Sequence, residues 1–149
     1  MPPSSKKQSS SAPPPPQGYV LVVEDDVFLR GLLVDKLRKS GYPVQEAENG
    51  KKALVQLRTT TPILIFLDLL MPEMDGFQFL EEMKKDKKVS EVPVCVLSNL
   101  DDPGQIARAQ KLGVRDYLIK ANLFLDEIVE KAARIINEKK NLPPLKASS

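Results

Sequence analysis

The sequence predicts an α/β domain of three layers, in which helices cover both faces of a five-stranded parallel sheet. Short runs rich in Val, Ile and Leu alternate five times with segments in which apolar residues recur every three or four positions. Several short runs are apolar throughout, which is typical of strands covered on both faces. Because a parallel crossover needs a connection of helix length, this alternation predicts a doubly wound parallel sheet.

The five expected strands differ in how apolar they are. The first, third and fourth are almost wholly apolar and should lie in the interior of the domain. Cys95 lies in the fourth and is interpreted as core packing, since a single cysteine excludes an internal disulfide and any multi-cysteine metal site. The expected strands span residues 19–25, 43–47, 63–68, 93–98 and 116–120.

The five expected helices are indicated by apolar residues at helical spacing. Gly41 and Gly113 follow the first and fourth helices as C-terminal caps, and Asp102 precedes Pro103 as an N-cap does. The pair Asp75-Gly76 is interpreted as a turn. The apolar positions are Phe28, Leu29, Leu32, Leu33 and Leu37; Ala53, Leu54 and Leu57; Phe77, Leu80 and Met83; Ile106, Ala109 and Leu112; and Ile128, Val129, Ala132, Ile135 and Ile136.

The ends of the chain differ in composition from its middle. Residues 1–17 and 141–149 are rich in Pro, Ser and Lys, so we expect disordered tails around a folded domain at 18–140. A net charge of +2 gives no electrostatic case for direct nucleic-acid binding. No segment predicts membrane insertion or a signal peptide, and the expected location is the cytoplasm. The sequence contains no histidine, which removes histidine-based catalysis and metal binding.

Polar and charged side chains stand where four of the apolar strands end. Glu24 and Asp25 end the first strand, Asp68 the third, Ser98 the fourth and Lys120 the fifth. Any one of these alone is ordinarily a helix cap or a solvated loop residue. Together they should meet at the carboxyl edge of the sheet, where ligands bind in open parallel sheets. Three carboxylates repel one another there, so the pattern favours a hard divalent cation, Mg²⁺ rather than Ca²⁺, with Lys120 adding positive charge.

Four stretches together resemble the receiver domain of two-component response regulators, of the stand-alone type related to chemotaxis regulators. They are LVVEDD, FLDLLMPEMDG, VLSN and DYLIK. The resemblance implies a flavodoxin-like (βα)5 fold with strand order 2-1-3-4-5. It implies phosphorylation of Asp68, with Ser98 and Lys120 binding the phosphoryl group and Tyr117 as an aromatic switch. Mg²⁺ would be held by Glu24, Asp25, Asp68 and the carbonyl of Leu70.

The resemblance also implies how such a chain would act. A histidine kinase or a phosphotransfer protein would donate the phosphoryl group, and the chain would catalyse only its own phosphoryl transfer and autodephosphorylation. It would signal by phosphorylation-dependent binding to a protein target that the sequence does not identify. Homodimerisation could use the surface of the fourth helix, fifth strand and fifth helix, at about residues 103–138.

Two residues depart from the pattern that the family usually shows. Ala121 stands where proline usually follows the lysine, and Asn99 stands where a small residue usually follows the hydroxyl. Asn99 could partly cover the site or add a hydrogen bond, and the loop at Ala121 could be more mobile or trans. Leu70 and Leu100 are apolar, which leads to the hypothesis that they shield the phosphoryl group from water and give it a long lifetime.

The same residues bear on three other functions. A receiver-fold interaction module that does not use phosphate is left open by Ala121 and Asn99. A phosphatase with an aspartyl nucleophile needs a second acid two residues after the nucleophile, where this chain has Leu70. A flavin-binding protein of this fold class needs a loop rich in Gly and hydroxyl residues after the first strand, where the chain instead has carboxylates.

Overall fold

The computed structural model describes residues 18–141. The tail expected at residues 1–17, and residues 142–149 of the other expected tail, lie outside this part of the chain. Asn141, the first residue of the expected C-terminal tail, is the last residue of the final helix.

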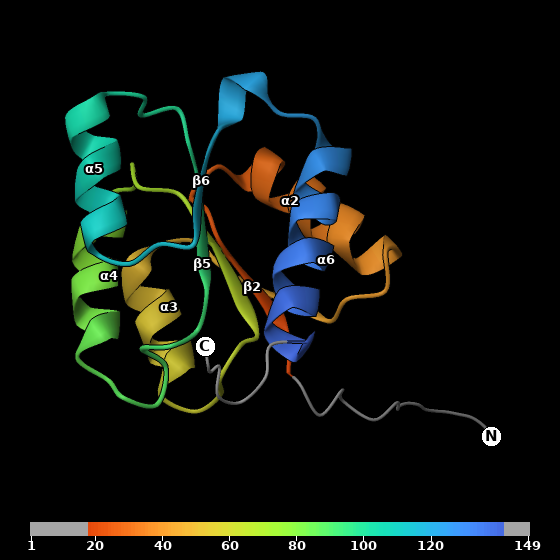
Figure 1. The fold of residues 1–149 in the computed structure, drawn as a ribbon, viewed down its shortest axis with the longest axis horizontal. Coiled ribbons are helices and arrows are strands. Elements are labelled where there is room, and N and C mark those ends of the chain that lie inside the picture. Colours follow the sequence, from red (N-terminus) through yellow and green to blue (C-terminus); the bar gives the residue numbers. More distant parts are fainter. Residues whose placement is uncertain (1–17, 142–149) are drawn as a thin grey trace.

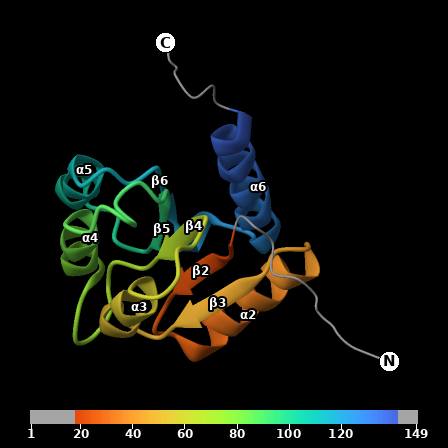
Figure 2. The same ribbon diagram turned by 90° about the horizontal axis from the view of Figure 1, so that it is seen from below.

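Five parallel strands form one sheet, as the sequence predicts. Its order, β3-β2-β4-β5-β6, is 2-1-3-4-5 when the strands are counted along the chain, so the predicted doubly wound topology is confirmed (Figure 2). β3 lies at one edge, and its middle residues Gln45 and Glu46 are exposed. The strands are β2 (Val20–Val23), β3 (Val44–Ala47), β4 (Leu64–Leu67), β5 (Val94–Ser98) and β6 (Asp116–Ile119).

Helices cover both faces of the sheet, which gives the three predicted layers (Figure 1). α2 (Val27–Lys39) and α6 (Leu125–Asn141) lie on one face. The other face is covered by α3 (Gly50–Leu57), α4 (Gly76–Lys84) and α5 (Pro103–Lys111). A short 3-10 helix, η1 (Lys120–Asn122), joins β6 to α6.

The sheet divides the core into two apolar clusters, because successive side chains of a strand point to opposite faces. Leu21 and Val23 of β2 belong to the cluster under α3, α4 and α5. Val20 and Val22 belong to the cluster under α2 and α6. Cys95 is completely buried in this second cluster, where burial raises the pKa of its thiol to about 12. Its predicted role as core packing is therefore confirmed.

The apolar stripe predicted for the first helix is partly wrong. Phe28 is 75% exposed and Leu32 is 38% exposed, whereas Val34, which the stripe omits, is buried. At roughly 100° of rotation per residue, Phe28 and Leu32 fall on the side of α2 opposite to Leu33 and Leu37. Because α2 packs on β2, β3 and α6, only the face that carries Leu33, Val34 and Leu37 is covered.

The helix caps show why the ends were predictable. Gly41 and Gly113 have φ values of +99° and +88° and directly follow Ser40 and Leu112, the C-cap residues of α2 and α5, as the C-cap prediction requires. Asp102 caps α5 by accepting a hydrogen bond from the N–H of Gln105 at 3.1 Å, and Pro103 is the first helical residue. Both interpretations are confirmed.

The interpretation of Asp75-Gly76 as a turn is wrong, because this pair begins a helix. The Asp75 side chain accepts from the N–H of Gln78 at 2.9 Å, and the Gln78 side chain accepts from the N–H of Asp75 at 3.1 Å. A Cβ on Gly76 would lie 2.7 Å from both the carbonyl oxygen of Asp68 and the Cα of Leu69. α4 therefore packs directly on the backbone that follows β4, and only glycine fits at its first position.

Candidate functional site

The predicted residues meet at the carboxyl edge of the sheet, around the ends of β2 and β4, the neighbouring strands between which the strand order reverses. The N–H of Glu24 donates to the carbonyl of Ala47 at 3.1 Å, and the N–H of Asp68 donates to the carbonyl of Val23 at 3.0 Å. These bonds continue the strand pairing by one residue, so both acids are held by the sheet. Ser98 is the last residue of β5, and Lys120 directly follows β6.

Three carboxylates form a cluster, and one ammonium group contacts two of them. Oxygens of Glu24, Asp25 and Asp68 all lie within 4.8 Å of one another. Glu24 is only 2% exposed and Asp68 only 4% exposed. The Lys120 Nζ lies 2.8 Å from Glu24 Oε1 and 3.0 Å from Asp68 Oδ2. The structure thus brings together four of the predicted residues, which directly follow β2, β4 and β6.

Burial and charge oppose each other in this cluster. The pKa of Glu24 is raised, mainly by burial and further by the negative charge of Asp68. The hydrogen bonds of Glu24 to Lys120 and to the N–H of Asp26 act in the opposite direction but do not outweigh burial. Burial acts to lower the pKa of Lys120, but hydrogen bonds and charge from Glu24 and Asp68 outweigh it, and the net pKa is raised. Lys120 is therefore an ammonium at neutral pH.

The donor set fits a hard divalent cation. All three clustered side chains offer carboxylate oxygens, and they outnumber the single ammonium, so negative charge is left over in a largely buried place. Carboxylate oxygens with room for water are the surroundings that Mg²⁺ takes in proteins. Neither sulfur nor imidazole is present in the group, which disfavours softer metals.

Backbone groups from two loops orient the side chains. The N–H of Leu70 donates to Asp68 Oδ1 at 3.1 Å, which fixes the carboxylate whose other oxygen contacts Lys120. Ser98 is completely buried, and its Oγ accepts from the N–H of Leu100 at 3.2 Å. The structure places Leu70 against Asp68 through this N–H, and the predicted use of the Leu70 carbonyl as a metal ligand stays a prediction.

Tyr117 reaches the loop that follows Ser98. It is half-buried on β6, and its hydroxyl donates to the carbonyl of Leu100. Burial raises the pKa of the Tyr117 hydroxyl, and the negative charges of Asp68 and Asp101 raise it further. Leu100 therefore bonds to Ser98 through its N–H and to Tyr117 through its carbonyl, a link that side-chain patterns could not reveal.

Sequence reasoning missed Arg30. Its Nη1 donates to the carbonyl of Glu24 at 2.8 Å, and its Nε pairs with Glu46 Oε1 at 2.9 Å. Asp26 was also unassigned and caps α2 by accepting from the N–H of Leu29 at 3.1 Å. The sequence pattern that could have indicated these two residues is an acid, Asp26, followed four positions later by an arginine, Arg30. This pattern is too common in helices to identify a functional site.

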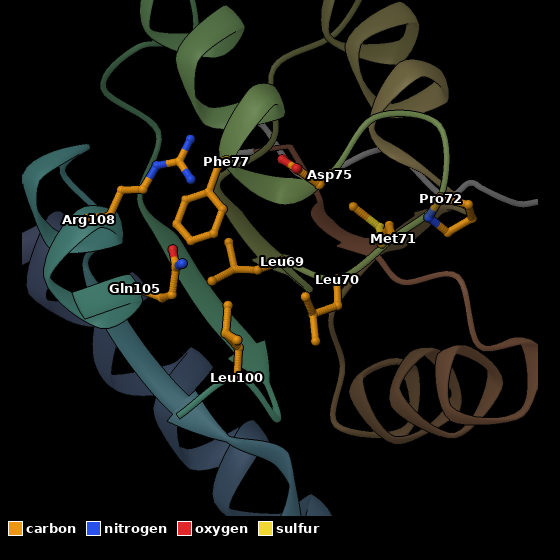
Figure 3. A pocket seen from close by; sticks show the side chains of 9 residues that line it. All are labelled: Leu69, Leu70, Met71, Pro72, Asp75, Phe77, Leu100, Gln105 and Arg108. Atoms are coloured by element: carbon orange, nitrogen blue, oxygen red, sulfur yellow. The ribbon is translucent and has the colours of Figure 1, made fainter. Parts of the chain in front are cut away.

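A groove of about 500 Å³ lies beside the loop after Asp68, between the starts of α4 and α5 (Figure 3). Its apolar wall includes Leu69, Leu70 and Leu100. Across it, the Arg108 guanidinium lies 4.1 Å from the centre of the Phe77 ring. Leu70 is 54% exposed here, whereas the adjacent Asp68 is buried. Leu70 and Leu100 therefore share one groove, and the predicted shielding of a phosphoryl group on Asp68 by these two leucines stays a prediction.

Within residues 18–141, none of the helices has both the length and the apolar character that crossing a membrane requires.

Comparison with known proteins agrees with this geometry. The family model for the response regulator receiver domain matches residues 20–133. The two-component response regulator ORR3 of Oryza sativa subsp. indica is 36% identical over 103 residues, which cover 68% of this chain and 79% of that protein. The probable transcriptional regulator ycf27 of Cyanophora paradoxa is 31% identical over 130 residues, or 87% of this chain and 52% of that protein.

Solved structures share both fold and sequence. The receiver domain of a signal transduction histidine kinase from Syntrophus aciditrophicus has a TM-score of 0.75 at 28% identity, covering 87% of this chain and 98% of that one. A Francisella response regulator receiver domain has a TM-score of 0.74 at 29% identity, covering 80% and 97%.

The chain spans about half or less of the length of the first curated relatives it matches. The match to the family model nevertheless runs through all five strands and reaches into α6. The chain belongs to the response regulator receiver domain family.

Proposed function

We propose that this chain accepts a phosphoryl group on Asp68 and signals by phosphorylation-dependent contact with another protein. The observation that supports this most is the place of the Lys120 ammonium, between the buried carboxylates of Glu24 and Asp68. A carboxylate held at the end of a strand beside a fixed cation suits attack on an anionic donor. Because the chain has no histidine, the phosphohistidine would come from a histidine kinase or a phosphotransfer protein.

In the proposed step, a carboxylate oxygen of Asp68 attacks the phosphorus of phosphohistidine. An O–P bond forms while the P–N bond breaks, and the imidazole leaves with the electron pair and takes a proton from water. Lys120 would donate hydrogen bonds to the phosphoryl oxygens, and the Ser98 hydroxyl would do the same. Catalysis by the chain would be limited to this transfer and to hydrolysis of its own aspartyl phosphate.

The acidic cluster would hold Mg²⁺. Asp25 and Asp68 would be direct ligands together with the Leu70 carbonyl, and Glu24 would act through water. Both oxygens of Glu24 already have partners, since Oε1 contacts Lys120 and Oε2 accepts from the N–H of Asp26 at 3.1 Å, which suits an indirect role. Bound Mg²⁺ supplies positive charge as negative charge spreads over the transferring group.

The signal would leave the site through Leu100. A shift of Ser98 towards bound phosphoryl oxygens would carry Leu100 with it, because the two are hydrogen-bonded. Tyr117 donates to the Leu100 carbonyl and would follow the loop as the switch residue. The surface that would change comprises α5, β6 and α6, at about residues 103–138, and it would bind the downstream protein or a second copy of the chain.

Phosphorylation should require a divalent cation. With a small acyl phosphate and Mg²⁺, we expect intact-protein mass spectrometry to find one phosphoryl adduct, and with a chelator in place of Mg²⁺ we expect none. The reason is that three carboxylates near the donor repel it until their charge is balanced. An adduct that forms equally well with chelator would contradict the metal site.

Leu70→Ala should shorten the lifetime of the aspartyl phosphate several-fold. Leu70 is half-exposed beside the buried Asp68, so its removal opens the approach to water. The measurement is adduct loss with time after the donor is removed. Val55→Ala is the matched control, since Val55 is 56% exposed against 54% for Leu70 and lies on α3. Equal lifetimes in all three proteins, or a rapid loss from the wild type, would refute the shielding hypothesis.

A phosphate-independent interaction module is the second candidate. One observation favours it: Lys120 already contacts both buried carboxylates, so each of these two side chains has an ion-pair partner without a ligand. If the wild-type chain takes no phosphoryl group from the small donor in the presence of Mg²⁺, this second function replaces the first.

A further inference from the structure

A side-chain hydrogen bond joins the two loops that carry Ser98 and Lys120. The N–H of Ala121 donates to Asn99 Oδ1 at 2.9 Å, across 22 positions of sequence. Asn99 directly follows Ser98, and Ala121 directly follows Lys120. The bond therefore connects the residues adjacent to the two groups proposed to bind phosphoryl oxygens.

The bond lies just beyond the end of the sheet. β5 and β6 pair in parallel up to Ser98 and Ile119, and no strand pairing holds the chain after these residues. Asn99 and Ala121 then both line a groove of about 260 Å³, together with Lys120. The hydrogen bond thus continues the connection between the two strands by one residue, where the backbone alone no longer makes it.

This connection bears directly on Lys120. Lys120 begins the 3-10 helix η1, and the donating N–H belongs to the next residue of that short helix. A lysine side chain is long and has much rotamer freedom to lose. The hydrogen bond to Asn99 holds the backbone next to the one from which this side chain extends to Glu24 and Asp68.

The bond depends on the residue types at both positions. Proline at 121 would have no N–H to donate, and alanine at 99 would have no side-chain acceptor. The peptide bond between Lys120 and Ala121 is trans. Asn99 and Ala121, the two departures from the family pattern, are therefore the acceptor and the donor of one hydrogen bond.

We propose that Asn99 is a positioning residue: it holds the turn at Lys120 and Ala121, so that the Lys120 ammonium stays between Glu24 and Asp68. The expected effect of Asn99 on phosphorylation rests on the proposed function, whereas its effect on the position of Lys120 does not. Asn99 itself need not touch the phosphoryl group, since it acts through the backbone of the neighbouring loop.

The first test is a double-mutant cycle on the rate of phosphorylation by a small acyl phosphate. Asn99→Ala should slow adduct formation about fivefold, the change that fits the loss of one hydrogen bond. In the Ala121→Pro background the same substitution should have almost no effect, because no N–H remains to be held. An equal slowing in both backgrounds would overturn the proposal, since Asn99 would then act without this bond.

The second test does not depend on phosphorylation. The NMR signal of the Lys120 ammonium, recorded on the unphosphorylated protein, should broaden or shift in Asn99→Ala and stay unchanged in Asn122→Ala. Asn122 is an exposed asparagine in the same short helix and serves as the matched control. An unchanged signal in Asn99→Ala would overturn the proposal. A changed signal in a protein that takes no phosphoryl group would support the positioning role and reject only the proposed function.

Discussion

Asp68→Asn is expected to abolish phosphorylation by a small acyl phosphate, so that mass spectrometry finds no adduct where the wild type carries one. Asparagine has nearly the same shape but no anionic oxygen with which to attack phosphorus. The variant should stay folded, because Lys120 keeps its contact with Glu24 at 2.8 Å. The loss would then be chemical and not structural.

A second acid near the same edge of the sheet provides the control. Asp101 is exposed in the loop after β5, and Asp101→Asn makes the same chemical change without touching the buried cluster. We expect this variant to form the adduct as the wild type does. The wild-type adduct should also be released by hydroxylamine, as acyl phosphates are. An adduct that persists in Asp68→Asn would place the acceptor on another residue.

Lys120→Met should have the second-largest effect, on both stability and rate. Methionine keeps most of the length of the side chain but leaves Glu24 and Asp68 without the cation between them. Breaking a buried ion pair by removing one partner costs about 3 kcal/mol or more of the free energy of unfolding. Loss of one preorganised donor at the site should slow phosphorylation about 100-fold or more. Urea denaturation and adduct formation measure the two effects.

The stability deficit of Lys120→Met should depend on pH. Burial already raises the pKa of Glu24, and removing Lys120 removes a hydrogen bond that lowers it, so the pKa rises further. In the pH range between its unfolded and folded pKa values, Glu24 binds more protons when folded, so stability falls as pH rises. The deficit against the wild type should therefore be larger at about pH 8 than at about pH 5.

An exposed lysine separates this effect from a general loss of charge. Lys85 pairs with Glu82 at 3.0 Å, but its side chain is 71% exposed. Lys85→Met should change the free energy of unfolding by less than about 1 kcal/mol, with little dependence on pH. If Lys120→Met behaves like Lys85→Met, the cluster is not held by Lys120.

The fold was largely readable because its signals are local. Alternating apolar runs and helical stripes identified the five strands and five α-helices of residues 18–141, and Gly41, Gly113 and Pro103 marked three of their ends. The errors came where packing chose among apolar residues. Phe28 is as apolar as the buried residues of its helix, and it is exposed because α2 turns another face to β2, β3 and α6.

The candidate site was partly readable, because chain order sends every strand end of a parallel sheet to the same edge. This was enough to bring Glu24, Asp25, Asp68 and Lys120 together. Backbone groups carry the rest: the N–H of Leu70 on Asp68, and the Leu100 backbone between Ser98 and Tyr117. Backbone N–H and carbonyl groups are the same in almost every residue, so the sequence does not predict which side chain each of them will bond.

By itself, the sequence determined the order of strands and helices, the apolar cores and the acids at the strand ends, because periodicity and composition are properties of neighbouring residues. Only the tertiary structure decided the contacts between distant loops. Asn99 and Ala121 each looked like an isolated departure from a pattern. Their meeting at 2.9 Å depends on how β5 and β6 end side by side, and hydrogen-bond geometry of that kind exists only once the chain is folded.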